Sequence, residues 1–242
     1  MCLVFIAHRV EGCPSIMIGA NREESRSRPA TSPVCCRSWS LRCLLAGADH
    51  GPDGSFPQMG TWLGVNEAKV AVAVTNRHDG ELAWADQTRS RGLLAVDLLG
   101  FDHPERAAHF ARAELGQGGF GGCNYLIAGL DAAFVVQAPG STRVSVTELS
   151  PGIHAMTNLD LDDGGDPRIR LVAVNLAPVH FRTSAQRLCR DDRIVVSGGD
   201  RGTVSSSLIM FDEDLVFLHI RGDPRFRDYQ EYRLLDRALS HD

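Results

Sequence analysis

The sequence predicts one α/β domain, of the α+β kind, in which sheets are covered by helices. The 242 residues are 43% hydrophobic and 23% charged, which is sufficient to bury one large core. Strands, a helical block, further strands, one helix and final strands follow one another along the chain, and this order does not fit a regular βαβ alternation. We therefore expect residues 1–242 to form a single domain.

The first elements are two predicted strands. Cys2 to Ala7 is apolar at nearly every position and ends in a polar pair, which is typical of a strand buried on both faces. Ile16 to Ile18 is a short apolar partner that follows Pro14. We expect these strands to form a hairpin, followed by a polar loop from Asn21 to Arg28.

The middle of the chain contains two further strands and a pair of helices. Residues 30–59 are rich in Pro and Gly, so we expect a long surface excursion with a strand near Leu44 to Ala46. Thr61 to Val65 and Val70 to Thr75 are predicted strands joined by a turn. Leucines at helical spacing indicate a helix within Ser90 to Leu99, and Pro104 marks the start of another.

The rest of the chain is mostly predicted strand. The expected strands are Asn124 to Ala128, Ala133 to Gln137, Arg143 to Leu149, Gly152 to Thr157, Ser205 to Phe211 and Leu215 to Ile220. A helix is expected from Pro167 to about Leu176, and a helix or strand from Tyr229 to Leu239.

Charge and composition exclude several classes of function. A net charge of -5 argues against a nucleic-acid surface, which needs clustered Lys and Arg. No apolar run approaches the roughly 20 residues that span a bilayer, so we expect a soluble, cytoplasmic protein without a membrane span. The seven cysteines form an odd set without regular spacing, so we expect most of them to be reduced.

Two local patterns are weaker than they look, and we expect neither a cofactor nor a metal. The three glycines between Gly116 and Gly121 follow a predicted helix and precede a strand, which is the reverse of a dinucleotide-binding context. Cys35, Cys36, Cys43 and His50 lack the paired two-residue spacing of structural zinc sites.

Cys2 is the residue that carries a chemical prediction. A strand that begins at position 2 fixes this end of the chain inside the fold. Removal of Met1 would place a free α-amine, with a pKa of about 7.7 to 8.0, beside a thiol with a pKa of about 8.5. Such an amine can activate its own side chain as a nucleophile. The alternative is that Cys2 is a small buried thiol at the start of a strand.

The sequence resembles the NRDE family, also called the transport and Golgi organisation protein 2 family. The matching motifs are Met1-Cys2-Leu3-Val4-Phe5, Gly19-Ala20-Asn21-Arg22-Glu23-Glu24, Arg28-Pro29, Gly60-Thr61-Trp62-Leu63-Gly64-Val65-Asn66, Thr75-Asn76-Arg77, Ser90-Arg91-Gly92, Asn124-Tyr125, Thr157-Asn158-Leu159-Asp160 and the hairpin from Ser205 to Gly222. They cover nearly the whole chain. One departure is Glu23, which stands where the family's name-giving motif has Asp.

The resemblance extends to the N-terminal-nucleophile hydrolases and implies their four-layer αββα sandwich of two antiparallel sheets. The sequence also resembles the penicillin V acylase and bile-salt hydrolase group, in which an N-terminal cysteine attacks a linear amide. Carried over by position, Cys2 is the nucleophile and Asn76 and Asn158 contact the oxyanion. Glu23 orients the α-amine and Arg168 tunes the nucleophile. We expect further residues of the matching motifs to bind ligand, namely Asn21, Arg22, Trp62 and Asn66.

Two functions remain open from the sequence, beside a third possibility that the fold has lost activity and serves as a protein-interaction module. The first is a cysteine amidohydrolase that cleaves a non-peptide C–N bond in a small-molecule amide. The second is a non-catalytic binding or trafficking protein for a hydrophobic ligand, haem or lipid, which the association of the family's eukaryotic members with lipid metabolism and haem handling implies. Catalysis requires a free Cys2, whereas a carrier tolerates Met1 and Cys2→Ser. The sequence leaves the substrate and the oligomeric state open.

Overall fold

The computed structural model describes residues 2–28, 30–48, 60–77, 89–140 and 143–234. The chain divides into two compact units. The first comprises residues 1–28 and 149–232, and the second comprises residues 29–148 and 233–242. Each unit contains one antiparallel sheet with helices packed on it, as predicted for the fold class. The single domain stays a prediction.

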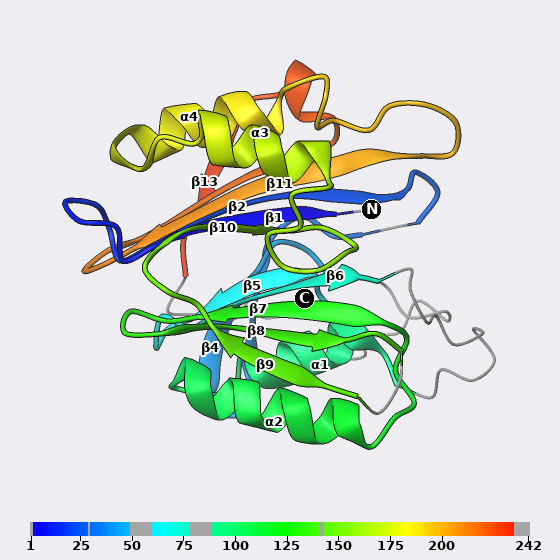
Figure 1. Ribbon diagram of the computed structural model, residues 1–242, viewed down its shortest axis with the longest axis vertical. Helices are drawn as coiled ribbons and strands as arrows, with labels where there is room; N and C mark the ends of the chain where they lie inside the picture. Colours follow the sequence, from blue (N-terminus) through cyan, green and yellow to red (C-terminus); the bar gives the residue numbers. More distant parts are fainter. Residues whose placement is uncertain (1, 29, 49–59, 78–88, 141–142, 235–242) are drawn as a thin grey trace, which may run out of the picture. The chain divides into compact units, whose positions relative to one another are not determined.

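The first unit is built on a six-stranded sheet in the order β10-β1-β2-β11-β12-β13 (Figure 1). Its strands are β1 (Leu3–His8), β2 (Ile16–Ser25), β10 (Gly152–Met156), β11 (Arg201–Phe211), β12 (Leu215–Arg221) and β13 (Gln230–Tyr232). Strand β1 lies inside the sheet, with Val4 paired to Met156 on one side and to Ala20 on the other. This explains why β1 is apolar from Leu3 to Ala7, because its residues are buried and both of its edges are paired.

Strand β2 is much longer than the sequence predicts. The expected polar loop from Asn21 to Arg28 is wrong, because the strand continues through Asn21, Arg22 and Glu23 to Ser25. Partner strands on both sides explain the difference, since β1 pairs with the first part of β2 and β11 pairs along its whole length. The register shifts between Thr203 and Ser205 of β11, so a β-bulge lies opposite the polar end of β2.

Two α-helices cover one face of this sheet, α3 (Pro167–Asn175) and α4 (Phe181–Cys189) (Figure 1). The helix α3 was expected, whereas α4 was missed although Phe181, Ala185 and Leu188 follow a helical spacing. Short 3₁₀ turns at Pro178–His180 and Pro224–Phe226 complete this layer. Apolar side chains from both helices and from the strands beneath form one continuous core.

The second unit contains a seven-stranded meander in the order β3-β4-β5-β6-β7-β8-β9. Its strands are β3 (Val34–Ser38), β4 (Leu41–Leu45), β5 (Leu63–Asn66), β6 (Ala71–Asn76), β7 (Cys123–Ala128), β8 (Ala133–Ala138) and β9 (Ser145–Glu148). Helices α1 (Arg91–Leu98) and α2 (Pro104–Gly116) pack on it and share a second apolar core. Ser90 caps α1 and His103 caps α2 through their side chains.

The surface excursion expected over residues 30–59 is partly wrong. Its described part contains the hairpin of β3 and β4, of which the sequence indicated one strand near Leu44. Residues 49–59, including His50, lie outside the described residues, as do residues 235–239 of the segment expected from Tyr229 to Leu239, whose described part contains β13. No helix among the described residues is long and apolar enough to cross a membrane.

Candidate active site

Cys2 directly precedes β1 at the polar end of β2. The register pairs Leu3 with Asn21, so the next pair along the same ladder places Cys2 opposite Arg22. The Cys2 residue is half-buried. Burial raises the pKa of its thiol, and a hydrogen bond from the Glu23 backbone and the charge of Arg22 act in the opposite direction. In the chain that still carries Met1, the thiol is therefore a weak nucleophile.

Glu23 is a buried carboxyl group beside this strand end. Its residue is 4% exposed, and an Nη1 atom of Arg168 lies 3.5 Å from its Oε2 atom. Burial raises the pKa of Glu23 to about 7, although the positive charge of Arg168 opposes that shift. Glu23 therefore changes its charge near neutral pH.

Arg168 is held by the residue that begins its helix. Asp166 is the N-cap of α3 and accepts a hydrogen bond from the Arg168 backbone at 2.8 Å. Its carboxylate also accepts from Arg168 Nε at 3.1 Å and Nη2 at 2.7 Å, and from Thr157 Oγ1 at 2.9 Å. Burial raises the pKa of Asp166, but these bonds outweigh burial and hold the pKa below its usual value. The carboxylate fixes the guanidinium beside Glu23.

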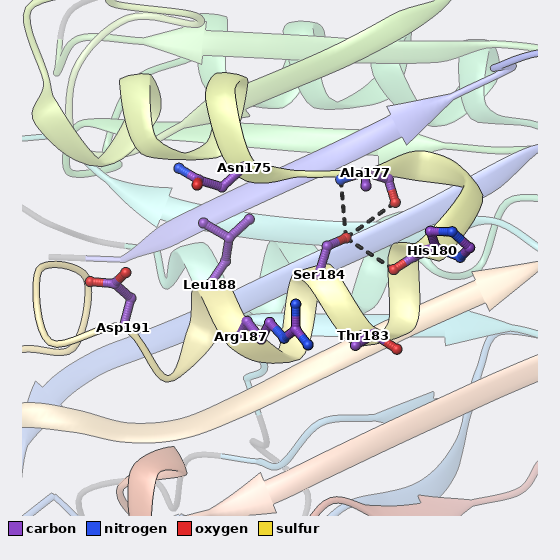
Figure 2. Close-up of a pocket in the computed structure, with 8 residues that line it drawn as sticks. All are labelled: Asn175, Ala177, His180, Thr183, Ser184, Arg187, Leu188 and Asp191. Atoms are coloured by element: carbon purple, nitrogen blue, oxygen red, sulfur yellow. Dashed lines mark hydrogen bonds between the residues drawn. The ribbon is translucent and has the colours of Figure 1, made fainter.

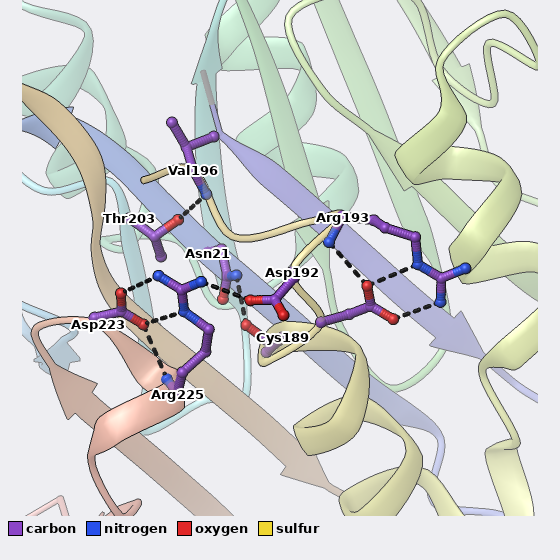
Figure 3. Close-up of polar contacts among 9 residues, drawn as sticks. Asn21, Cys189, Asp192, Arg193, Val196, Thr203, Asp223 and Arg225 are labelled. Carbon is purple, nitrogen blue, oxygen red and sulfur yellow. Dashed lines mark hydrogen bonds and ion pairs between the residues drawn. The ribbon is translucent and has the colours of Figure 1, made fainter. Parts of the chain in front are cut away.

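Three further predicted residues lie in the same unit. Asn158 follows Thr157 at the end of β10 and is 2% exposed. Arg22 is buried, with Nη2 3.7 Å from Glu24 Oε2. The side-chain amide of Asn21 donates to the carbonyl of Cys189 at 2.9 Å and so ties β2 to the end of α4 (Figure 3).

The loop that follows α4 is anchored near the β-bulge of β11. The backbone amide of Val196 donates to Thr203 Oγ1 at 3.0 Å, and Arg225 Nη1 donates to Asp192 Oδ1 at 2.6 Å (Figure 3). Thr203 is paired with Glu23 across the strands. These bonds hold the β11 segment beside Glu23 in place.

The remaining predicted residues belong to the second unit. Asn76 is the last residue of β6, is partly exposed and pairs with Cys123 of β7. Trp62 packs against the core of that unit. Asn66 is fully buried, and its side-chain amide donates to the carbonyls of Leu99 and Phe101 at 2.8 and 2.7 Å, which ties the end of β5 to the segment after α1. The roles of these residues toward Cys2 and a ligand stay predictions.

A pocket of about 510 Å³ lies between α3 and α4 (Figure 2) and contains none of the predicted site residues. Its lining residues are Asn175, Ala177, His180, Thr183, Ser184, Arg187, Leu188 and Asp191. The Ser184 hydroxyl is engaged there with Ala177 and His180 of the connecting turn. The titratable groups near Cys2 are a better candidate for chemistry than this open pocket.

The described residues contain no group of three or more His, Cys, Asp or Glu side chains that could hold a metal ion. The sequence reasoning missed Asp166 and Thr157, which position Arg168. Asp166 had a recognisable signal, because an Asp before the Pro that starts a helix is a typical N-cap.

The arrangement can support chemistry at Cys2 in three ways. The thiol lies at a strand end, a carboxyl group with a pKa of about 7 is next to it, and a fixed guanidinium adds positive charge. Burial lowers the pKa of Arg168, but the Asp166 hydrogen bond and the negative charges of Glu23, Asp166 and an ionised Cys2 outweigh burial and raise it. Such a combination favours a group that gains or loses a proton near neutrality.

The comparisons identify a sequence family and a fold. Residues 1–188 match the family described as Transport and Golgi organisation 2. No curated protein sequence is significantly similar to the chain. An N-acylethanolamine-hydrolyzing acid amidase ortholog from Caenorhabditis elegans gives a TM-score of 0.61 at 17% identity, over 86% of this chain and 92% of its own.

Two solved variants of conjugated bile acid hydrolase from Clostridium perfringens give TM-scores of 0.51 and 0.54 at 10% and 11% identity. Each comparison covers 100% of this chain and 99% of the other. At these identities the likeness concerns the fold, and it confirms the predicted N-terminal-nucleophile-hydrolase fold.

Proposed function

The chain belongs to the Transport and Golgi organisation 2 family, and from this premise we propose that it is an N-terminal cysteine amidohydrolase. Its substrate is a linear amide with a non-peptide C–N bond. The structural neighbours that hydrolyse N-acylethanolamines and conjugated bile acids support this choice, because both have the same fold.

The observation that carries the proposal is the position of Glu23 and Arg168 at the end of β1. Glu23 is nearly inaccessible to solvent, and its pKa of about 7 makes it an anion in weakly alkaline solution. Once Met1 has been removed, the nitrogen of Cys2 becomes an amine that this carboxylate can hold by a charge-assisted hydrogen bond. Burial beside a fixed guanidinium perturbs the pKa of Glu23, and carboxyl groups with perturbed pKa values are common at functional sites.

The proposed reaction uses the Cys2 amine as the proton shuttle. The amine takes the thiol proton, and the thiolate attacks the carbonyl carbon of the amide. The side-chain amide of Asn158, which belongs to the same unit as Cys2, donates a hydrogen bond to the oxyanion that forms. The ammonium then gives its proton to the leaving nitrogen, the C–N bond breaks, and a thioester to Cys2 remains. Water, deprotonated by the amine, attacks the thioester and releases a carboxylic acid and the free thiol.

Intact mass measurement with a thiol-directed probe tests the state of Cys2. We expect the active protein to lack one methionine and to be labelled fastest at Cys2. Cys2→Ala should lose this fast labelling, whereas Cys13→Ala should retain it. Cys13 is a matched control because it is also half-buried and belongs to the same unit. Retention of Met1 together with a Cys2 no more reactive than Cys13 contradicts the proposal.

Substrate tests separate hydrolysis from binding. An N-acylethanolamine or a conjugated bile acid should add its acyl group to wild-type protein as a transient mass increase, which Cys2→Ala should not show. A carrier for a hydrophobic ligand predicts a different outcome, in which ligand binds equally to wild type, to Cys2→Ser and to protein that retains Met1, without any acyl adduct.

A further inference from the structure

A second pair of cysteines lies in the hairpin of β3 and β4, which belongs to the second unit. Cys36 of β3 and Cys43 of β4 are direct cross-strand partners. Residues directly opposite each other in an antiparallel pair point to the same face of the sheet. Both thiols therefore lie on the face that packs against the core beneath α1, where Cys43 is a core residue and Cys36 packs at its margin.

The geometry of directly opposed residues suits a disulfide bond. Their Cα atoms lie about 4.5 to 5.5 Å apart in an antiparallel ladder. Disulfide-bonded cysteines have Cα separations of about 4.4 to 6.8 Å. No change in strand pairing is needed to join Cys36 to Cys43.

The two thiols differ in accessibility. Cys43 is fully buried, and its Sγ lies 3.6 Å from the carbonyl oxygens of both Leu41 and Leu99, to either of which its single S–H can donate. Cys36 is half-buried on β3, the outermost strand of the sheet. The interaction with the neighbouring Cys43 thiol lowers the pKa of Cys36, and the same interaction together with burial raises the pKa of Cys43. The accessible thiol is thus the better nucleophile, and the buried one is placed to react with it.

We propose that Cys36 and Cys43 form a redox-active dithiol site, which a hydroperoxide oxidises to an intramolecular disulfide. The Cys36 thiolate attacks one peroxide oxygen, the O–O bond breaks, and the leaving oxygen takes a proton to become an alcohol or water. The Cys43 sulfur then attacks the sulfur of the Cys36 sulfenic acid, a disulfide forms and water leaves. Two thiols and one peroxide give one disulfide, one water and one alcohol or second water.

Neighbouring cysteines do not share this arrangement. Cys35 precedes Cys36 on β3, so its side chain points to the other face of the strand, and its Sγ donates to the carbonyl of Arg233 at 3.6 Å. Its cross-strand partner is Leu44. Cys35 therefore serves as an internal control that is one residue away and has no thiol opposite it.

To test this proposal, the folded protein is treated with hydrogen peroxide, alkylated without reduction, and analysed by peptide mass mapping. We expect a cross-linked peptide containing Cys36 and Cys43, lighter than the two thiol forms by two hydrogen atoms, and restored by a dithiol reductant. Cys35→Ser should form the same cross-link, and Cys36→Ser should form none. Separate alkylation of Cys36 and Cys43 after complete peroxide consumption would overturn the proposal.

Two controls show whether a change in folding, and not the loss of a thiol, accounts for the result. Cys36→Ser is preferred to Cys43→Ser because Cys36 is half-buried, and circular dichroism verifies that the variant keeps its strands. Oxidation of urea-unfolded wild type gives the reference for chance pairing. If the folded protein joins Cys36 to Cys43 no faster than the unfolded chain, the hairpin does not promote the reaction and the proposal fails.

Discussion

Glu23 shows how a single residue couples the fold to pH. Its carboxyl group has an ordinary pKa of 4.5 and a pKa of about 7 in the folded chain, because burial disfavours its charged form. Between these two values the folded protein holds a proton that the unfolded chain has released. The contribution of Glu23 to the free energy of unfolding is therefore fully present below pH 4.5, and it is lost as the pH rises toward about 7.

We expect Glu23→Gln to flatten the pH dependence of the free energy of unfolding between about pH 4.5 and 7. The change in relative stability across this range should be on the order of 3 kcal/mol. Urea unfolding at a series of pH values measures it. Glu24→Gln is the control, because burial raises the pKa of Glu24 but hydrogen bonding and nearby arginines lower it further, so its contribution is lost as pH falls. An unchanged slope in Glu23→Gln would show that Glu23 does not titrate in this range.

Asp166 belongs to a local motif that the first unit uses three times. Asp166, Asp191 and Asp223 each accept hydrogen bonds from the backbone, Nε and a terminal nitrogen of the arginine two residues later. The three pairs differ in burial. The side chains of Asp166 and Arg168 are 5% and 11% exposed, whereas those of Asp191 and Arg193 are 23% and 65% exposed.

We expect Asp166→Ala to lower the free energy of unfolding by about 3 kcal/mol or more. The change removes a helix cap, and it also removes the carboxylate that accepts hydrogen bonds from the buried guanidinium of Arg168. Asp191→Ala is the matched control and should cost about 1 kcal/mol or less, because its arginine stays hydrated. Equal losses in urea unfolding would show that burial does not decide the strength of this motif.

The sequence named residues of the candidate site but did not name the residues that hold them in place. Cys2, Glu23 and Arg168 came from motif resemblance, and the structure places them around one strand end. The sequence reasoning did not use the local Asp166-x-Arg168 motif, and it could not reveal the bond from Thr157 to Asp166, which joins the end of β10 to the start of α3. Residue type also gave no measure of burial, which is the property that raises the pKa of Glu23.

At the scale of elements, the ring of Phe5 on β1 lies directly against the backbone of Gly19 on β2, and this close contact fixes how the two strands pack. A Cβ atom added to Gly19 would lie 2.2 Å from the Cζ atom of Phe5. Phe5 is fully buried and its ring packs against Phe181 of α4, with 6.2 Å between ring centroids. The ring cannot move without disturbing the helix above it.

We expect Gly19→Ala to destabilise the protein by about 1 to 3 kcal/mol through overpacking. Gly116→Ala, at the end of α2, should instead be neutral or stabilise by up to about 1 kcal/mol, because no atom lies within 4 Å of its added Cβ. Thermal unfolding of both variants makes the comparison. A stable Gly19→Ala would mean that Phe5 can repack.

Elements with a clear period were predicted well, and those with charged or mixed composition were not. The strands from Cys123 to Ala138 and the helices that begin near Ser90, Pro104 and Pro167 follow the expected positions. The second half of β2 was missed because its charged side chains are stabilised by tertiary partners. The hairpin of β3 and β4 was hidden by a composition of Cys, Arg and Ser that favours no single element.

At the scale of the whole molecule, the two sheets differ in how far apart along the sequence their paired strands lie. Every neighbour in the seven-stranded sheet is also a neighbour in sequence order. The six-stranded sheet instead pairs β1 with β10 and β2 with β11. Pairing of distant segments carries a larger loop-closure cost and is slower.

We expect the second unit to fold before the first during refolding from urea. All three tryptophans, Trp39, Trp62 and Trp84, lie within residues 29–148, so fluorescence follows that unit. Pulsed thiol labelling of Cys189, which is fully buried in the first unit, follows the other. Fluorescence should recover before Cys189 becomes protected. Protection of Cys189 at the same rate or earlier would contradict this order.

The pairing of Val4 with Met156 also determines how late in protein synthesis β1 can acquire its second neighbouring strand. A ribosome adds about 5 to 20 residues per second, so the 151 residues between these partners take roughly 8 to 30 s to make. During that interval the apolar segment of β1 has one edge without its strand. The nascent chain is thus most vulnerable to misassociation, and most dependent on chaperones, before its β10 segment has left the ribosome.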